Sequence, residues 1–214
     1  MPPPPQSFRL RLSAEKLGIE RGGRTLLTNL TLSVGPGEAL IVTGPNGAGK
    51  SSLLRVLAGL LRPSDGSIRL EGLSDDDDPA PGAHAHYVGH ADAQKPALTA
   101  RENLQFWAAM LSQSRTGATP EAALARFSIR HTADFQTGYL SAGQKRRLAL
   151  ARLLTAPRPI WILDEPATAL DAATQESFAD IMREHLSAGG VIVAATHAPL
   201  GLAGARELRL GSTP

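Results

Sequence analysis

The sequence predicts an α/β fold with a parallel central sheet, an antiparallel strand unit ahead of it and a helical module inserted into it. Two continuous apolar runs, at residues 160–163 and 191–195, are typical of parallel strands buried on both faces. Alternating apolar positions at residues 8–12 and 30–34 indicate two antiparallel strands. The alanine-rich pattern at residues 99–127 has the period of helices and indicates the inserted module.

The length of 214 residues suits a single domain, which we expect to span residues 7–214. The helical subdomain is expected at about residues 91–155, inserted in the α/β core. The proline-rich residues 1–6 are expected to form a disordered tail.

Composition excludes several classes of protein. The chain has no cysteine, which excludes disulfides, thiolate metal sites and cysteine nucleophiles. Its formal charge of +2 does not indicate a nucleic-acid partner, and none is expected. Neither a signal peptide nor a run of roughly eighteen apolar residues is present, so we expect a cytosolic location.

A glycine-rich segment after the predicted strand at residues 39–42 has the spacing of a Walker A phosphate loop. Backbone N–H groups of such a loop turn towards the phosphates, the lysine reaches the β and γ oxygens, and the hydroxyl binds Mg²⁺. An ordinary glycine turn would not explain the Lys-Ser pair, so the segment predicts a phosphate-loop NTPase. The residues expected to hold the nucleotide are Gly44, Pro45, Asn46, Gly47, Ala48, Gly49, Lys50, Ser51 and Ser52.

The helix after the loop is expected to run from Lys50 to just before Pro63. Asp65 and Gly66 are then expected to turn the chain into a strand at residues 68–70. The acidic run at residues 75–78 lacks the ligand spacing of a metal cage, so we interpret it as a solvated loop. The apolar face of the helix is expected to comprise Leu53, Leu54, Leu57, Leu60 and Leu61.

Two acidic residues follow the apolar run at residues 160–163 and form a Walker B pattern. Asp164, at the carboxyl end of the strand, is suited to hold Mg²⁺, and Glu165 is suited to face the attacking water. This strand end is expected beside the phosphate loop, because ligands of open α/β sheets bind outside the carboxyl ends of the strands.

The segment at residues 140–144, Leu-Ser-Ala-Gly-Gln, followed by the basic residues 145–147, resembles the LSGGQ signature of ATP-binding cassette (ABC) proteins. Ser141 is expected to cap a helix that runs through residues 148–154, and Gly143 permits close backbone approach. A γ-phosphate could therefore dock at this helix N-terminus. Further similarities are residues 169–171, which resemble the D-loop, and Thr196-His197, which resembles the switch histidine.

The resemblance to ABC nucleotide-binding domains covers nearly the whole chain. It implies a RecA-like core, ATP and Mg²⁺ as ligands, ATP hydrolysis, and a second copy of the chain paired head to tail around two nucleotides. It also implies that Asp164 holds the metal, that Glu165 is the general base and that His197 contacts the γ-phosphate. A plain core histidine is the alternative for His197. The residues that would clamp the nucleotide of the opposite copy are Ser141, Gly143 and Gln144.

Two positions depart from the pattern of that family. His90 stands where a glutamine that senses Mg²⁺ through a water is usual. An imidazole can accept a hydrogen bond as an amide does, but it titrates near neutral pH. Gln94 is a less favoured substitute for that glutamine. Arg21 stands where an aromatic residue that stacks on adenine is expected. Either its guanidinium stacks on the base instead or base recognition is loose, which leaves the choice between ATP and GTP open.

The remaining histidines His84, His86, His131 and His185 are expected to be solvated or structural. In particular, the pair at residues 84 and 86 is expected to lie in a solvated loop. No haem-ligating pattern is therefore assigned to it.

The same departures narrow the resemblance to the ATPase subunit of the bacterial haem exporter of cytochrome c maturation. The segments that carry it are residues 87–90, 95–104, 140–144 and 161–166. This resemblance implies an integral-membrane permease partner, a peripheral position on the cytoplasmic face of the inner membrane, and release of a haem-loaded chaperone. The alternatives are the ATPase of another ABC exporter, a soluble DNA-repair or translation ATPase, and a nucleotide sensor without activity.

Overall fold

The computed structural model describes residues 8–74, 77–111 and 117–211. The expected disordered tail at residues 1–6 and the first two residues of the acidic run, Asp75 and Asp76, lie outside the described residues. Asp77 and Asp78 lie in a loop, as expected. No helix in the described ranges is long and apolar enough to cross a membrane.

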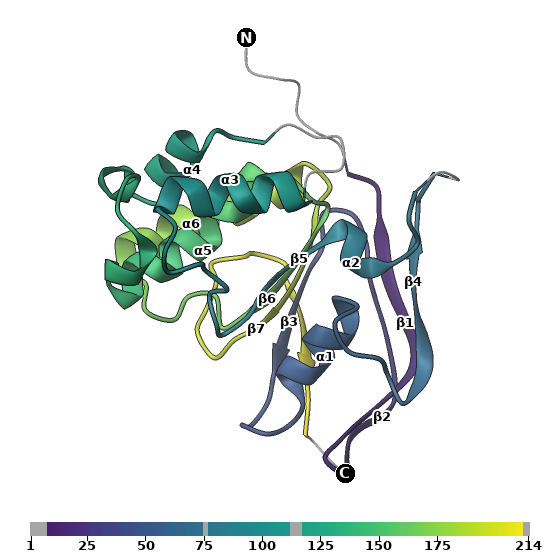
Figure 1. Ribbon diagram of the computed structural model, residues 1–214. Helices are drawn as coiled ribbons and strands as arrows, with labels where there is room; N and C mark the ends of the chain where they lie inside the picture. Colours follow the sequence, from purple (N-terminus) through teal and green to yellow (C-terminus); the bar gives the residue numbers. More distant parts are fainter. Residues whose placement is uncertain (1–7, 75–76, 112–116, 212–214) are drawn as a thin grey trace.

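Two sheets form the framework of the molecule (Figure 1). An antiparallel sheet has the strand order β2-β1-β4, and a parallel sheet has the order β5-β6-β7-β3-β8. Both predicted strand types are therefore confirmed. The strands are β1 (Arg11–Arg21), β2 (Arg24–Val34), β3 (Ala39–Thr43), β4 (Asp65–Glu71), β5 (Ala85–Val88), β6 (Ile160–Asp164), β7 (Val191–Ala195) and β8 (Arg206–Arg209).

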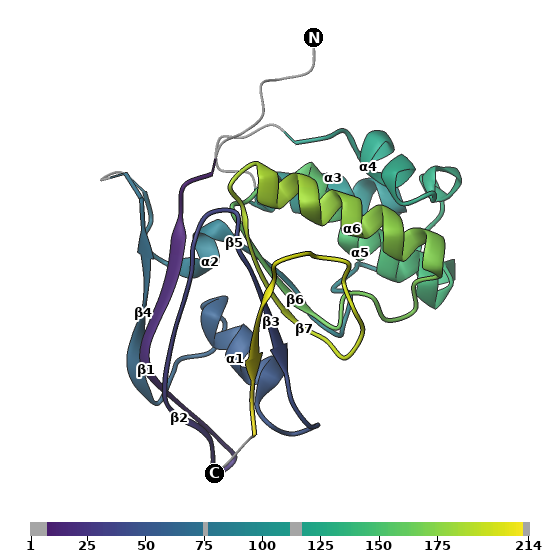
Figure 2. The ribbon, with the colours of Figure 1, turned by 180° about the vertical axis from the view of Figure 1, so that it is seen from behind.

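Helices cover both faces of the parallel sheet, as the two opposite views show (Figures 1 and 2). Helix α1 (Lys50–Leu57) lies between the two sheets, and α2 (Pro81–His84) is a single turn before β5. The predicted helical module is confirmed as α3 (Ala100–Leu111) and α4 (Pro120–Arg126), which both pack on α5 (Ala142–Thr155). Helix α6 (Ala172–Ser187) connects β6 to β7.

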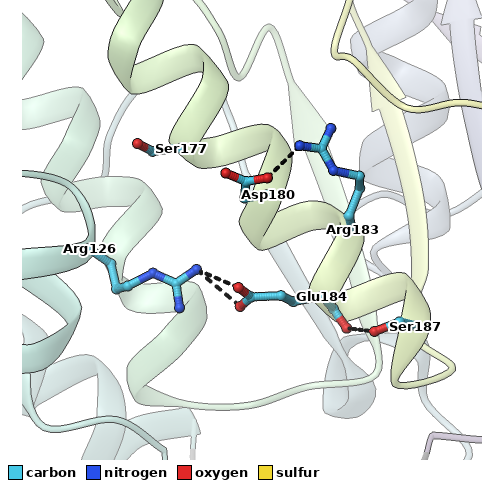
Figure 3. A pocket seen from close by; sticks show the side chains of 6 residues that line it. All are labelled: Arg126, Ser177, Asp180, Arg183, Glu184 and Ser187. Atoms are coloured by element: carbon cyan, nitrogen blue, oxygen red, sulfur yellow. Dashed lines mark hydrogen bonds and ion pairs between the residues drawn. The ribbon is translucent and has the colours of Figure 1, made fainter.

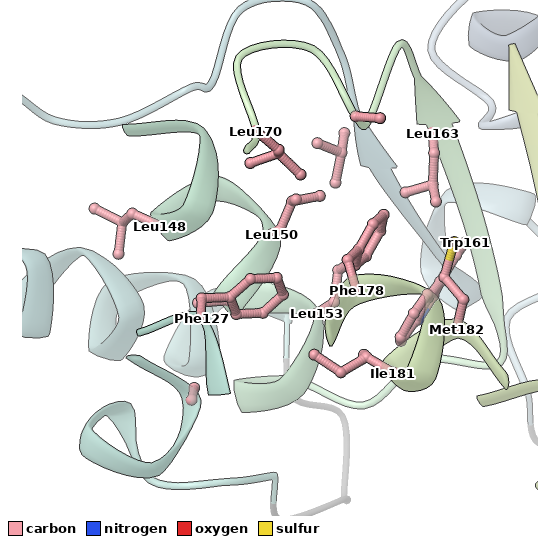
Figure 4. Packing of buried hydrophobic residues seen from close by; sticks show 14 of the residues in the cluster. Phe127, Leu148, Leu150, Leu153, Trp161, Leu163, Leu170, Phe178, Ile181 and Met182 are labelled. Carbon is pink, nitrogen blue, oxygen red and sulfur yellow. The ribbon is translucent and has the colours of Figure 1, made fainter. Parts of the chain in front are cut away.

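Strands β6 and β7 divide their side chains between two apolar cores, because successive residues of a strand point to opposite faces. Ile160 and Ile162 pack against α1, in the core shared with β1. Trp161 and Leu163 pack on the other face against α5 and α6, with Phe178 among their neighbours in that core (Figure 4). The continuous apolar runs are thus explained by burial on both faces.

The prediction for α1 was wrong at its end. The helix ends at Leu57, and Gly59 follows in the left-handed conformation with φ 71°. The N–H of Gly59 donates to Val56 O, and the N–H of Leu60 donates to Arg55 O, which is the Schellman pattern that ends a helix at a glycine. Leu60 is consequently 62 % exposed instead of buried on the expected face.

Three histidines lie in the interior, so the expectation of a solvated pair at His84 and His86 was wrong. His84 is 7 % exposed and His86 is 1 % exposed, and His86 belongs to strand β5. The Nε2–H group of His86 donates to Ala156 O at 2.5 Å. The His185 ring stacks on Trp161 with centroids 3.8 Å apart, whereas His131 is exposed. Their burial confirms a structural role for His84, His86 and His185.

Burial lowers the pKa of His86 to about 3 and that of His185 to about 4. The unfolded chain takes up protons on both rings below about pH 6.5, whereas the folded chain does so only at much lower pH. We therefore expect the free energy of unfolding to fall as the pH drops from 6.5 towards 4. At pH 5 the loss should be up to about 2 kcal/mol per histidine. Urea unfolding at pH 7 and pH 5 measures it.

The variant His86→Gln keeps a donor for Ala156 O but has no ring to titrate, so its stability should depend less on pH. His131→Gln is the matched control, because the exposed His131 should leave the pH dependence unchanged. Equal pH dependence in all three proteins would contradict this explanation.

Candidate functional site

Three neighbouring strands of the parallel sheet deliver the predicted site residues to one edge. Strand β7 pairs with β6 on one side and β3 on the other, all parallel, so their carboxyl ends meet. The phosphate loop follows β3, Asp164 ends β6 with Glu165 directly after it, and His197 follows β7. A cavity of about 310 Å³ lies at this edge, lined by Leu26, Asn46, Gly47, Gly49, Lys50, Ser51, Ser52, Asp164 and Glu165.

All three glycines of the phosphate loop have a positive φ, which residues with a Cβ rarely adopt. Gly44 has φ 134°, and a Cβ there would lie 2.4 Å from Leu210 O; Gly49 has φ 94°. Lys50 bends back over the loop, and its ammonium donates to Gly44 O at 2.7 Å and to Pro45 O at 3.2 Å. The loop therefore presents a cation and backbone N–H groups at the start of α1, where the helix dipole also favours an anion.

His197 lies beside both Lys50 and Glu165. Its Nε2 atom is 3.2 Å from Lys50 Nζ and 3.8 Å from Glu165 Oε1. Because an ammonium only donates, a hydrogen bond between these two atoms requires Nε2 as the acceptor. The structure thus brings these three side chains together, although Lys50 lies 147 positions before His197 in the sequence and Glu165 lies 32 positions before it.

Glu165 is held in a strained backbone conformation. Its φ is 49°, a value that residues with a Cβ rarely adopt. Its N–H donates to Ala195 O at 2.8 Å. Residues in such conformations cluster at functional sites, because the surrounding structure must hold them there. The neighbouring Asp164 is 5 % exposed.

Ser51 and Asp164 both line the cavity and supply the hard oxygen donors that Mg²⁺ prefers. Among the described residues, no group of three or more histidine, aspartate or glutamate side chains could hold a metal by itself. Mg²⁺ at nucleotide sites needs only one or two protein ligands, since phosphate oxygens and water complete its shell. This donor pair therefore fits Mg²⁺.

The signature segment forms a helix N-terminus outside this cavity. Ser141 caps α5: its hydroxyl accepts from the N–H of Gln144, and the Gln144 side chain accepts from the N–H of Ser141. The predicted cap is therefore confirmed, with a reciprocal capping box. The close approach at Gly143 is to Ala169 of the same chain, since a Cβ there would lie 3.2 Å from Ala169 O.

Several predicted nucleotide-binding residues do not line the cavity. Besides Arg21 and His90, these are Gly44, Pro45, Ala48, Ser141, Gly143 and Gln144. Arg21 is exposed at the end of β1 and pairs with Arg24 across a tight turn formed by Gly22 and Gly23. His90 is exposed, just beyond the end of β5. Leu26 does line the cavity, and sequence reasoning missed it, because a leucine on β2 carries no signal for a ligand.

Arg146 is a second residue that sequence reasoning missed. The sequence presents it only as one member of a basic cluster, but it is 4 % exposed. Its guanidinium donates to the carbonyl oxygens of Asp164 and Glu165 at 3.0 and 2.7 Å. No pattern in the sequence indicates this contact, which joins α5 to the end of β6.

A larger cavity of about 480 Å³ lies between α4 and α6 and contains none of the predicted site residues (Figure 3). Its charged groups pair with one another: Arg126 donates to both carboxylate oxygens of Glu184, and Arg183 pairs with Asp180. We therefore place the functional site at the strand ends and not there. The lining residues are Arg126, Ser177, Asp180, Arg183, Glu184 and Ser187.

The fold is shared with solved ATP-binding cassettes. A dimeric cassette in a post-hydrolysis state, bound to ADP and Pi, matches with a TM-score of 0.78 and 25 % identity, over 93 % of this chain and 94 % of that one. The predicted fold class is therefore confirmed. Residues 27–168 match the sequence profile of the ABC transporter family.

Two relatives are similar over almost their whole length. The cytochrome c biogenesis ATP-binding export protein CcmA of Nitrobacter winogradskyi is 54 % identical over 202 residues, which is 94 % of this chain and 98 % of the relative. The protein of the same name from Chelativorans sp. is 50 % identical over 203 residues, 95 % of this chain and 99 % of the relative. The chain therefore belongs to the ABC transporter family, as an ATPase of the cytochrome c biogenesis export type.

Proposed function

We propose that the chain hydrolyses ATP at the carboxyl ends of β3, β6 and β7 to drive an export complex of cytochrome c biogenesis. The observation that carries the site is the convergence of Lys50, Glu165 and His197, with Nε2 of His197 3.2 Å from Lys50 Nζ and 3.8 Å from Glu165 Oε1. These three side chains supply a cation, a base and a polar contact around one point.

Each residue takes one role in this proposal. Lys50 binds the β and γ phosphate oxygens, and Ser51 with Asp164 holds Mg²⁺, which neutralises phosphate charge when bound. Glu165 accepts a proton from the attacking water, and His197 contacts the γ-phosphate. Asn46, Gly47 and Gly49 contribute loop atoms around the phosphates, because they line the same cavity.

A second copy of the chain completes the site. Ser141, Gly143 and Gln144 do not line the cavity of their own chain, although they form a capped helix N-terminus suited to an anion. Ser141 is exposed and so is free to meet a partner. The similarity to a dimeric cassette with ADP and Pi supports a head-to-tail pair in which these residues clamp the nucleotide of the other copy.

The membrane side of the complex is proposed from the relatives. Their name, cytochrome c biogenesis ATP-binding export protein, supports an exporter of that pathway. We propose an integral-membrane permease as the partner, a peripheral position on the cytoplasmic face of the inner membrane, and release of a haem-loaded chaperone as the output. The ATPase of another ABC exporter is the alternative.

A strain that carries only Glu165→Gln should lack covalently bound haem in its c-type cytochromes while b-type cytochromes still assemble. The reason is that loss of the base stops the ATPase, and an ATPase of this pathway is needed only for covalent haem attachment. Haem-stained gels of membrane and periplasmic fractions measure the result. The strain is grown under conditions in which its energy metabolism needs no c-type cytochrome.

Glu176→Gln is the matched control, because Glu176 is an exposed glutamate on α6 that does not line the cavity, and it should leave c-type cytochromes normal. Normal c-type cytochromes in the Glu165→Gln strain would reject the role in this pathway. That result would favour another exporter, with the family membership unaffected.

A further inference from the structure

The guanidinium of Arg146 lies inside the protein and uses all five of its N–H donors. Two of its nitrogens reach the end of β6 and the residues after it. Nε donates to Pro166 O at 3.2 Å, and Nη2 donates to Asp164 O at 3.0 Å and Glu165 O at 2.7 Å. The other nitrogen, Nη1, donates to Gly89 O at 2.8 Å and Asp92 Oδ1 at 3.0 Å. Arginine is the one side chain with five donors in a fixed fork.

Three separate parts of the fold meet at this side chain. It comes from the second turn of α5, one turn after the Ser141 cap, and it joins the end of β6 to the segment after β5. Most of its acceptors are main-chain carbonyls, so the contacts fix backbone positions and not only side chains. A buried arginine with every donor satisfied holds these segments in one arrangement.

The backbone at Glu165 needs such support. Its φ of 49° is unfavourable for a residue with a Cβ, and its own carbonyl and that of Asp164 are the ones that Arg146 holds. The direction in which the Glu165 side chain leaves the backbone depends on this conformation. A small change of φ there would move the carboxylate relative to the phosphate loop.

The contacts on the other side surround His90. Gly89 immediately precedes it, and Asp92, which forms an ion pair with Arg146, lies two residues after it. The side chain of Asp92 is 22 % exposed, so the pair is largely shielded from water. The loop that carries His90 is thus tied to the backbone of Glu165 through one guanidinium.

We propose that Arg146 is a positioning residue for hydrolysis: it sets the orientation of the Glu165 carboxylate and links it to the loop at residues 89–92. The proposal rests on the proposed role of Glu165 as the base. It does not require contact between Arg146 and the nucleotide, since Arg146 does not line the cavity.

The variant Arg146→Met removes the donors but keeps an apolar stem of similar length. We expect kcat for ATP hydrolysis to fall by about tenfold or more, with the Kd for fluorescent ATP within about threefold of the wild-type value. Arg146→Lys keeps a positive charge for Asp92 but loses the planar set of five donors. Its kcat should therefore lie between those of the wild type and Arg146→Met. Both are measured on protein shown to be folded by circular dichroism.

Arg158→Met is the matched control for loss of a buried arginine. Arg158 is 8 % exposed and also donates to main-chain carbonyls, those of Gly82, Ala85 and Leu111, which lie away from the cavity. It should lower the melting temperature as Arg146→Met does but leave kcat unchanged. Equal kcat losses in both variants would mean a general structural effect and would overturn the proposal.

If Arg146→Met does not fold, the variant Asp92→Asn still tests the proposal, because it removes only the charge of the ion pair. We expect a kcat loss of about twofold to fivefold with unchanged Kd. No further loss is expected when Asp92→Asn is added to a folded Arg146→Met protein, because that variant already lacks the ion pair. Wild-type kcat in Arg146→Lys and in Asp92→Asn would overturn the proposal. Glu165→Gln separates this result from the proposed function: if that variant hydrolyses ATP normally, the role of Glu165 itself is wrong.

Discussion

Glu165→Gln should lower ATP hydrolysis by about two orders of magnitude or more while ATP still binds. The amide keeps the shape and the hydrogen bonds of the carboxylate but cannot accept a proton from the attacking water. Binding should persist, because the loop around Lys50 does not depend on the Glu165 side chain for its hydrogen bonds. Phosphate release and binding of fluorescent ATP measure the two effects separately.

The same variant should accumulate a dimer with ATP and Mg²⁺, since the closed pair opens after hydrolysis in the proposed cycle. Size exclusion with and without nucleotide measures this, with Glu176→Gln as the control that hydrolyses and dissociates. A Glu165→Gln protein that remains monomeric with ATP, even with its membrane partner present, would count against the head-to-tail pair.

Lys50→Ala should weaken ATP binding by about tenfold to a hundredfold, and hydrolysis should fall with it. Charge-assisted hydrogen bonds are worth about 1.5–3 kcal/mol each, and an ammonium at this position is the cation nearest to the loop carbonyls of Gly44 and Pro45. One of those contacts is part-buried and the other is exposed, and neither lies in an apolar core, so the fold should remain intact. Titration with fluorescent ATP and thermal melting measure affinity and stability.

Lys16→Ala is the matched control, because Lys16 is exposed on β1 and does not line the cavity. It removes one lysine charge from the molecule without touching the loop, so its affinity should equal that of the wild type. If Lys50→Ala bound and hydrolysed ATP as the wild type does, the assignment of the phosphate loop would be wrong.

The strand ends could be located from the sequence because their signals are local. The phosphate loop is a contiguous segment between a strand and a helix, and Asp164 with Glu165 directly follows an apolar run. The rule that ligands bind at the carboxyl ends of parallel strands then places both segments, and His197 after β7, at one edge. The structure confirms that placement, with His197 between Lys50 and Glu165.

Predictions about single residues without a local pattern were less reliable. Leu60 has the spacing of a core position, yet Gly59 ends the helix before it and leaves it exposed. His86 stands near glycine and proline residues typical of a loop, yet it belongs to β5 and is buried by α5 and the segment after it. Burial of such residues depends on what packs over them, which lies far away in the chain.

The sequence by itself determined the fold class, the ATP-binding motifs and the resemblance to ABC proteins, because glycines, apolar runs and helix caps act within a few neighbouring residues. Only the tertiary structure decided which side chains meet. Arg146 reaches Glu165 across 19 positions and Gly89 across 57, and Lys50 meets His197 across 147. Such contacts depend on how helices and strands pack, and a periodic pattern carries no information about them.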